Sequence, residues 1–348
     1  MKLLILTQKV DKNDPALGFF CRWIEEFAKN YEKVIVVCLY KGQYDLPENV
    51  FVYSLGKEDG VSKLTYIYRF YKYIFSFRKE YDAVFVHMNQ IYLVLGGLFW
   101  NALKKPVGLW YSHKAKTFSL WLAEKFANFI FTNSKESFTV PTKKANYFGH
   151  GIDILAGIRP LSFAEPRDKY AILSVGRITS DKDQKTIIEA CEILSKQGIP
   201  AHFTFVGAPT AQGDDIYFNN LKKLVKEKNL EDKVVFVGGL PQTKVFPYFW
   251  RSNIHINACG LGSLDKTVLE AAAGGTIPVV SNEAFEDILG EYADRLIFQR
   301  GDAESLAKCI KNILESDDME TIRTTLEKKV QENFDIEILI KRIAKTIL

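Results

Sequence analysis

The chain of 348 residues is long enough for two domains, and its 47% hydrophobic and 25% charged content is typical of a globular protein. Its five cysteines are far apart, which excludes a disulfide framework or a clustered cysteine metal site and favours a reducing, cytoplasmic setting. The net charge of +4 is uneven, because residues 1–160 carry +8 and residues 161–348 carry −4, so the first half favours an anionic partner.

The first half alternates short β-branched runs with amphipathic stretches, which predicts a parallel sheet with helices on both faces. Met1 and Lys2 lead into four apolar residues, a run too short for a secretory leader and typical of a first strand. The predicted strands are residues 2–8, 33–40, 50–55, 83–88, 107–112, 129–132 and 146–149. The predicted helices include residues 17–30, 62–79 and 91–103.

Residues 83–103 contain no Asp, Glu, Lys or Arg and are long enough to span a bilayer. However, the polar residues His87, Asn89 and Asn101 interrupt this segment, and a glycine pair lies inside it. We therefore favour a buried strand followed by a buried helix over a transmembrane span.

Residues 157–169 combine Gly, two Pro and mixed charge, which is typical of a linker, and a second strand–helix series follows. Its predicted strands are residues 171–175, 202–206, 234–237, 254–257, 277–280 and 295–298, and its predicted helices include 184–197, 216–227, 266–273 and 303–314. The sequence thus predicts an α/β protein with two doubly wound parallel-sheet domains.

We place these domains at residues 1–160 and 161–334, and we expect a C-terminal helix at 335–348 to pack back on the first domain. In open parallel sheets, ligands bind beyond the carboxyl ends of the strands. The cleft between two such domains is then the expected active site, and the residues that follow each strand are the candidates for function.

The loop after the strand at 171–175 holds a glycine and two cations. Gly176 would let the backbone come close to a ligand, and Arg177 and Lys182 could neutralise a diphosphate leaving group as its charge develops. The alternative is two solvated loop cations.

The segment 257–280 is the most informative, because a Gly-rich loop leads into a small-residue helix and a further buried strand. Free backbone amides at the helix start, near Lys266 and Thr267, would form an anion site. Glu270 lies about one turn further on an apolar helix, where a carboxylate needs polar partners such as ribose hydroxyls. Alternatively, Glu270 caps its own helix or pairs with a structural lysine.

The order of these motifs resembles the retaining family-4 glycosyltransferases of GT-B fold. The resemblance covers nearly all of residues 169–316, and it extends more loosely to 131–134 and 149–153. It implies two Rossmann-like domains that face a central cleft, with the donor nucleotide sugar bound mainly by the C-terminal domain.

The resemblance also implies roles for matching residues. Arg177 and Lys182 match the pair that holds the donor diphosphate, and Glu270 matches the Glu that binds the nucleotide ribose. Gly239 and Leu240 match the turn that contacts the base, although paired glycines after a strand are also explained by a plain tight turn.

The loop around Asp265, Lys266 and Thr267 matches the one that cups the donor phosphate and sugar. One position departs from the family, which often has a further Glu eight residues before Glu270, where this sequence has Gly262. That Glu usually contacts the transferred sugar, so the contact would pass to Asp265 or Lys266.

On the acceptor side, His113 follows a predicted strand and loosely matches a family His near the transferred sugar; a structural His is the alternative. His87 is a similar, weaker candidate. Gly18 precedes a predicted helix and could let the backbone approach donor or acceptor, or it could simply start that helix.

The predicted helix at 62–79 is rich in both aromatic and basic residues. We interpret its outer face as Tyr66, Phe70, Tyr73 and Phe77 among basic side chains, which suits an anionic membrane surface. Packing against a neighbouring helix is the alternative. Membrane contact would favour a lipid-linked acceptor.

The sequence therefore predicts a retaining, metal-independent glycosyltransferase without cofactor or nucleic-acid partner. It would move a hexose-type sugar from a nucleotide-diphosphate sugar, such as a UDP-sugar, to a glycan or lipid-linked acceptor in cell-envelope synthesis. We expect a cytoplasmic setting with peripheral contact at the inner membrane face. The alternatives are a nucleotide-sugar epimerase of the same fold and a non-catalytic nucleotide-sugar-binding module, whereas no Gly-x-Gly-x-x-Gly motif supports a dinucleotide oxidoreductase.

Overall fold

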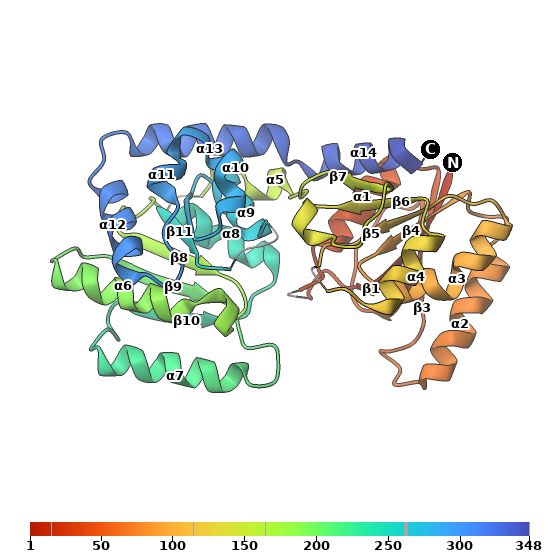
Figure 1. Ribbon diagram of the computed structural model, residues 1–348, viewed down its shortest axis with the longest axis horizontal. Helices are drawn as coiled ribbons and strands as arrows, with labels where there is room; N and C mark the ends of the chain where they lie inside the picture. Colours follow the sequence, from red (N-terminus) through yellow and green to blue (C-terminus); the bar gives the residue numbers. More distant parts are fainter. Residues whose placement is uncertain (15, 114, 164, 261–263, 348) are drawn as a thin grey trace. The chain divides into compact units, whose positions relative to one another are not determined.

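The computed structural model describes residues 1–14, 16–113, 115–163, 165–260 and 264–347. The chain divides into an N-terminal unit, Met1–Gly151 with Ile336–Leu348, and a C-terminal unit, Ile152–Asp335. Each unit contains one parallel sheet with helices packed on it; Figure 1 colours the first unit red to yellow, apart from its blue C-terminal helix, and most of the second unit green to blue.

The sheet of the N-terminal unit has the strand order β3-β2-β1-β4-β5-β6-β7, and every neighbouring pair is parallel. All residues of the central strand β4 are buried, as expected for a parallel sheet covered on both faces. The strands are β1 (Lys2–Val10), β2 (Lys33–Lys41), β3 (Val50–Ser54), β4 (Ala83–His87), β5 (Val107–Trp110), β6 (Phe129–Thr132) and β7 (Ala145–Tyr147).

The helices of this unit are α1 (Phe20–Asn30), α2 (Lys63–Ser76), α3 (Gln90–Ala102), α4 (Phe118–Phe126) and α14 (Ile336–Ile347). The last of these, at the chain's C-terminal end, packs along α1, where Ile340 and Ile343 share a buried cluster with Ile24 and Phe27. Helix α4 is not among the helices predicted from the sequence.

The uncharged segment 83–103 forms strand β4 and helix α3, as predicted. Close packing of α3 on α4 requires Gly97, since a Cβ there would lie 2.5 Å from the Cβ of Phe126. Within the described residues, no helix combines the length and apolar character needed to cross a membrane.

Helix α2 turns the opposite face outward from the one predicted. Phe70 is buried, and Tyr73 reaches inward, its hydroxyl donating to the Ser54 carbonyl at 3.3 Å. The exposed face instead carries Leu64 and Tyr68. Aromatic rings lie on both faces, so the sequence pattern did not determine which one meets β3, and Ile74 is buried together with Phe70.

The C-terminal unit has the strand order β10-β9-β8-β11-β12, also parallel throughout. The strands are β8 (Ala171–Val175), β9 (His202–Val206), β10 (Val234–Gly238), β11 (Ile254–Asn257) and β12 (Ile277–Val280). The helices are α5 (Ile154–Gly157), α6 (Gln184–Lys196), α7 (Asp214–Glu227), α8 (Gln242–Arg251), α9 (Lys266–Ala273), α10 (Glu286–Leu289), α11 (Ala293–Leu296), α12 (Ala303–Leu314) and α13 (Met319–Asn333).

The strand predicted at 295–298 is wrong. Residues Ala293–Leu296 form helix α11, and only Ile297 makes a bridge to Val280 of β12. One helical turn buries both Ala293 and Leu296 on the same side, which an extended strand would not do.

Candidate active site

The loops after β8, β9 and β10 are joined into one ledge by backbone hydrogen bonds. The Gly176 amide donates to the Val206 carbonyl at 3.0 Å, and the Gly207 amide donates to the Gly238 carbonyl at 2.9 Å. A Cβ on Gly207 would lie 1.7 Å from the Gly176 carbonyl oxygen, and its φ of +156° also favours glycine. The glycines therefore let three strand ends meet without intervening side chains.

Lys182 lies at this ledge and joins it to the start of α9. Its stem passes over Gly176, and its ammonium pairs with the Asp265 carboxylate across 83 residues of sequence. Asp265 also caps α9, because one carboxylate oxygen accepts from both the amide and the hydroxyl of Thr267 at 3.1 Å. The Asn257 side-chain amide donates to the other carboxylate oxygen at 3.0 Å.

The two charges of this pair stabilise each other. Burial would raise the pKa of Asp265, but Lys182 and the hydrogen bonds from Thr267 and Asn257 lower it well below its usual range. Burial likewise lowers the pKa of Lys182, but Asp265 raises it above its usual range overall. Both groups are thus ionised at neutral pH, and much of the Lys182 charge is already compensated.

Glu270 is buried on α9 and is held by two polar side chains. The Gln242 amide donates to its Oε1 at 2.5 Å, and the Lys266 ammonium lies 4.0 Å from the same oxygen. Burial raises the pKa of Glu270, and Lys266 and Gln242 oppose this shift. The predicted lysine pairing of Glu270 is therefore present, within the same cluster as the predicted donor loop.

Arg177 and the turn after β10 complete the residues that the sequence assigned to the donor. The Arg177 side chain is exposed, and within the described part of the chain it forms no ion pair. Its carbonyl accepts from the Gln184 side-chain amide at 2.9 Å, which fixes the loop. Gly239 lies beside the loop after β9, where a Cβ would be 3.3 Å from the Ala208 Cβ, and Leu240 follows it.

Three polar residues of this region were not found from the sequence. Gln242 begins α8 directly after the Gly-Gly turn, and Asn257 is the last residue of β11. Asp214 begins α7, where hydrogen bonds from backbone amides, led by Ala211, and the nearby charge of Arg177 lower its pKa. A search for polar residues at strand ends would have found Asn257.

His113 and Gly18 belong to the N-terminal unit. The His113 ring is exposed after β5, and its Nδ1 accepts from the Ala115 amide at 3.0 Å, so the neutral ring carries its proton on Nε2. Gly18 is required by its own loop, since a Cβ there would lie 2.6 Å from the Asp14 carbonyl oxygen. This contact favours helix initiation as the role of Gly18.

His87 is a structural residue. Its ring stacks on Phe20 at a centroid distance of 3.8 Å, and its Nδ1 lies 3.2 Å from the Thr7 hydroxyl. Burial lowers the pKa of His87 to about 3, so the imidazole is neutral at physiological pH.

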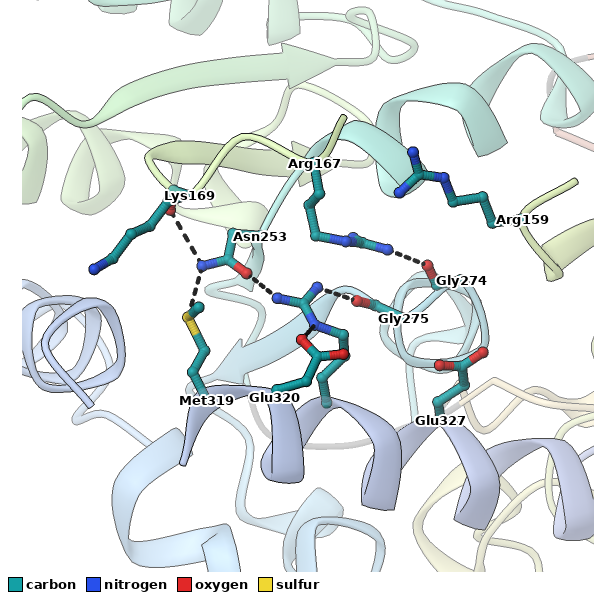
Figure 2. Close-up of a pocket in the computed structure, with 10 residues that line it drawn as sticks. Arg159, Arg167, Lys169, Asn253, Gly274, Gly275, Met319, Glu320 and Glu327 are labelled. Atoms are coloured by element: carbon teal, nitrogen blue, oxygen red, sulfur yellow. Dashed lines mark hydrogen bonds and ion pairs between the residues drawn. The ribbon is translucent and has the colours of Figure 1, made fainter. Parts of the chain in front are cut away.

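A cavity of about 500 Å³ opens at the amino ends of the strands of the C-terminal sheet, opposite the ends that carry the candidate site. It lies beside residues that precede β8, β11 and β12 (Figure 2). Its buried guanidiniums bind protein carbonyls. Arg167 donates to the Gly274 carbonyl at 2.9 Å, and Arg323 donates to the Gly275 carbonyl at 2.6 Å and to Glu320 at 2.9 Å. These arginines therefore hold the C-terminal end of α9 and are not part of the predicted donor site.

No cluster of three or more His, Cys, Asp or Glu side chains suited to a metal ion occurs among the described residues. Position 262, where the sequence departs from the family pattern, lies outside the described residues.

Residues 161–332, most of the C-terminal unit, match one protein family. That family is the glycosyl transferases group 1. The chain is 28% identical over 185 residues to the amylovoran biosynthesis glycosyltransferase AmsK of Erwinia amylovora, covering 51% of this chain and 44% of that protein. It is 23% identical over 217 residues to the putative colanic acid biosynthesis glycosyltransferase WcaL of Escherichia coli (strain K12), covering 60% and 52%. The matched region thus spans about half the length of these relatives.

The whole chain also resembles solved structures. Anabaena Alr3699/HepE in complex with UDP has a TM-score of 0.77 at 19% identity, with 100% of this chain and 99% of that chain covered. Sucrose-phosphate synthase from Thermosynechococcus elongatus has a TM-score of 0.73 at 16% identity, with 99% and 98% covered. The architecture is the GT-B fold, and together with the family match it supports a glycosyltransferase.

Proposed function

We propose that the protein is a retaining glycosyltransferase that moves a hexose-type sugar from a nucleotide-diphosphate sugar to an acceptor hydroxyl in envelope polysaccharide synthesis. The main support is the cluster of Lys182, Asp265 and Glu270 around α9, at the carboxyl ends of the strands, within a segment that matches the group 1 family. Relatives named for amylovoran and colanic acid biosynthesis support the polysaccharide role. Alr3699/HepE, solved with UDP-glucose, favours UDP as the nucleotide.

In this proposal the donor diphosphate lies on the glycine ledge between Arg177 and Lys182. The ribose hydroxyls bind Glu270, and the base contacts the turn at Gly239 and Leu240. As the bond between the anomeric carbon and the diphosphate oxygen breaks, these cations stabilise the developing charge without a metal. The acceptor oxygen forms the new bond, and its proton passes to the leaving diphosphate oxygen.

The hydrogen bonds of Asp265 support one of the two candidates for the sugar contact that the family Glu usually makes. The Asp265 carboxylate has about four lone-pair sites, and four donors from Lys182, Asn257 and Thr267 already fill them. It therefore acts as a positioning residue for Lys182 and α9. Lys266 is then our candidate for the contact with the transferred sugar.

Calorimetric titration with UDP tests the donor site. Arg177→Ala should weaken UDP binding by roughly tenfold or more, because a charge-assisted hydrogen bond contributes about 1.5–3 kcal/mol. Lys185→Ala removes an exposed cation on α6 and should leave the affinity unchanged. Equal UDP binding by wild type and Arg177→Ala would contradict the assignment.

Product analysis separates the proposed transfer from the alternatives. Incubation with a UDP-sugar and no acceptor should yield no isomeric nucleotide sugar, whereas an isomer would identify an epimerase. Glu270→Ala should abolish transfer to a glycan acceptor. Donor binding with no turnover in any acceptor mixture would instead favour a binding module.

A further inference from the structure

The N-terminal unit presents three adjacent helices, α2, α3 and α4, on its surface (Figure 1). Helix α2 contacts α3 through the Phe75 and Phe99 rings, whose centroids are 4.3 Å apart. Helix α3 contacts α4, and the Gln90 side-chain amide donates to the Ser119 hydroxyl at 3.1 Å. The three helices therefore form one continuous surface.

This surface is unusually apolar for one that is open to solvent. Of the eighteen large apolar side chains that are well exposed in the described chain, nine lie on it. On α2, Leu64 is 79% exposed and Tyr68 67%; on α3, Leu98 is 72% exposed; and on α4, Phe118 is 76% exposed beside Trp121. The other four are Ile67, Phe75, Ile91 and Leu103. Such a concentration marks an interaction site.

The same segment is strongly basic. Residues 62–126 contain ten Lys or Arg and three Asp or Glu, a net charge of +7 in a chain whose total is +4. The acidic groups of the segment already have partners: Glu80 pairs with Lys33 at 2.6 Å, and the buried Glu124 accepts from Thr142 at 2.8 Å and lies 3.3 Å from the Lys125 ammonium. Asp82 accepts from the Lys2 amide at 2.8 Å.

Exposed cations lie beside the apolar stripes. On α2, the exposed Lys72 lies one turn after Tyr68, and Lys79 is exposed in the turn that follows the helix. On α4, the Lys125 ammonium lies 5.5 Å from the Trp121 ring centroid. Apolar side chains bordered by lysines are the pattern of helices that lie flat in a membrane interface.

We propose that α2, α3 and α4 dock this protein on an anionic lipid bilayer, with the apolar stripes inserted between headgroups and the lysines paired with lipid phosphates. Charge complementarity selects this occupant, because residues 62–126 carry a net charge of +7 in sequence and a second copy would bring two such basic segments together. The inference does not rest on the proposed donor site, since all of its residues belong to the N-terminal unit.

Vesicle co-sedimentation of the full chain tests the proposal. The protein should bind vesicles of phosphatidylcholine mixed with phosphatidylglycerol, and added salt should weaken this binding. Vesicles of phosphatidylcholine alone should bind much less. Equal binding to both vesicle types, or to neither, would overturn the proposal.

Paired variants assign the binding to this surface. Replacement of both Lys72 and Lys79 by Ala should lower vesicle partitioning by roughly 30-fold, because each lysine near an anionic surface contributes about 1 kcal/mol. The matched control, Lys223→Ala with Lys226→Ala, removes two exposed lysines of α7 in the other unit and should have no effect. If both pairs lower binding equally, the attraction is non-specific and the assignment is wrong.

A second pair of variants tests insertion of the apolar stripes. Leu64→Ser with Phe118→Ser should reduce vesicle binding, whereas Ile216→Ser, at a 68% exposed site on α7, should not. Because these side chains are exposed, the melting temperature should be unchanged. If the protein instead forms a dimer in solution that Leu64→Ser with Phe118→Ser dissociates, a second copy is the occupant and the bilayer proposal is refuted.

Discussion

Asp265→Asn should tighten nucleotide binding even though it weakens the folded protein. Asn still caps a helix well, so the bond from the Thr267 amide survives. With its oxygen on the Thr267 amide, however, the Asn side chain turns its NH2 group toward the Lys182 ammonium, and this group cannot accept a hydrogen bond from the lysine. Breaking a buried ion pair costs about 3–5 kcal/mol, and the partial exposure of both side chains lowers our expectation to about 2 kcal/mol of unfolding free energy.

The gain in affinity follows from the position of the lost charge. A phosphate bound on the far side of the Lys182 ammonium would lie about 6 Å from the Asp265 carboxylate, two hydrogen-bonded contacts in series. At an effective dielectric constant of about 20, two unit charges at that distance repel by about 2–3 kcal/mol, and salt reduces this to about 1–2 kcal/mol. Removing the repulsion should tighten UDP binding by roughly tenfold.

Calorimetry with UDP and thermal unfolding with and without UDP measure the two effects separately. Asp265→Asn should melt earlier without ligand, but UDP should raise its melting temperature more than that of wild type. Asp181→Asn, an exposed change in the same turn as Lys182, should alter both quantities little. Unchanged or weaker UDP binding by Asp265→Asn would refute competition for Lys182 and show that the carboxylate orients this lysine for the ligand.

Three further predictions concern stability. Gly207→Ala would place a Cβ 1.7 Å from a carbonyl oxygen, so urea unfolding followed by circular dichroism should show a loss of several kcal/mol in unfolding free energy. The control Gly213→Ala, with φ +92° and open space around the Cβ, should lose only about 1 kcal/mol. Equal losses would contradict the close contact of the loops at Gly207. His87 has a folded pKa of about 3 against an ordinary 6.5, so its stabilising contribution is complete above pH 6.5 and is lost as the pH falls toward 3. His87→Phe should therefore flatten the pH dependence of unfolding in that window by up to about 1.4 kcal/mol per pH unit, and an unchanged slope would exclude His87 as the group that is protonated on unfolding. Arg323→Met removes the donor to the Gly275 carbonyl and to the Asn253 side-chain oxygen, so chemical unfolding should show a loss of about 3 kcal/mol. A neutral result would mean that these bonds contribute little to stability.

The sequence predicts the two sheets well because buried parallel strands leave long apolar β-branched runs, as in β2 and β12. It fails where local pattern does not determine packing. Residues 295–298 look like a strand, yet only Ile297 reaches β12. Helix α2 has aromatic rings on both faces, so its sequence does not show which face is buried. Its packing against the sheet determines this.

The site shows the same division. Glycines and charges at strand ends point to the carboxyl ends of the strands as the candidate site, because the parallel topology brings those ends together. The sequence does not show that Lys182 pairs with Asp265 or that the Thr267 amide is used by the helix cap, since these contacts join side chains far apart in the chain or depend on one rotamer. The distance in sequence between Gln242 and Glu270 likewise gives no indication that their side chains are hydrogen-bonded.

Helix α9 is only eight residues long, and it is fastened at its first turn by Asp265 and at its last by Arg167 and Arg323. Because the helix is short and hydrogen-bonded at both ends, a shift of its C-terminal end should also move its N-terminal end. Under the proposed function, random mutagenesis selected for altered donor preference should therefore recover substitutions on α13 and in the 165–169 linker, beyond the amino ends of the strands and away from the proposed donor site. Under the proposed function, engineering for new sugars would include these segments as well as the residues proposed to bind the donor.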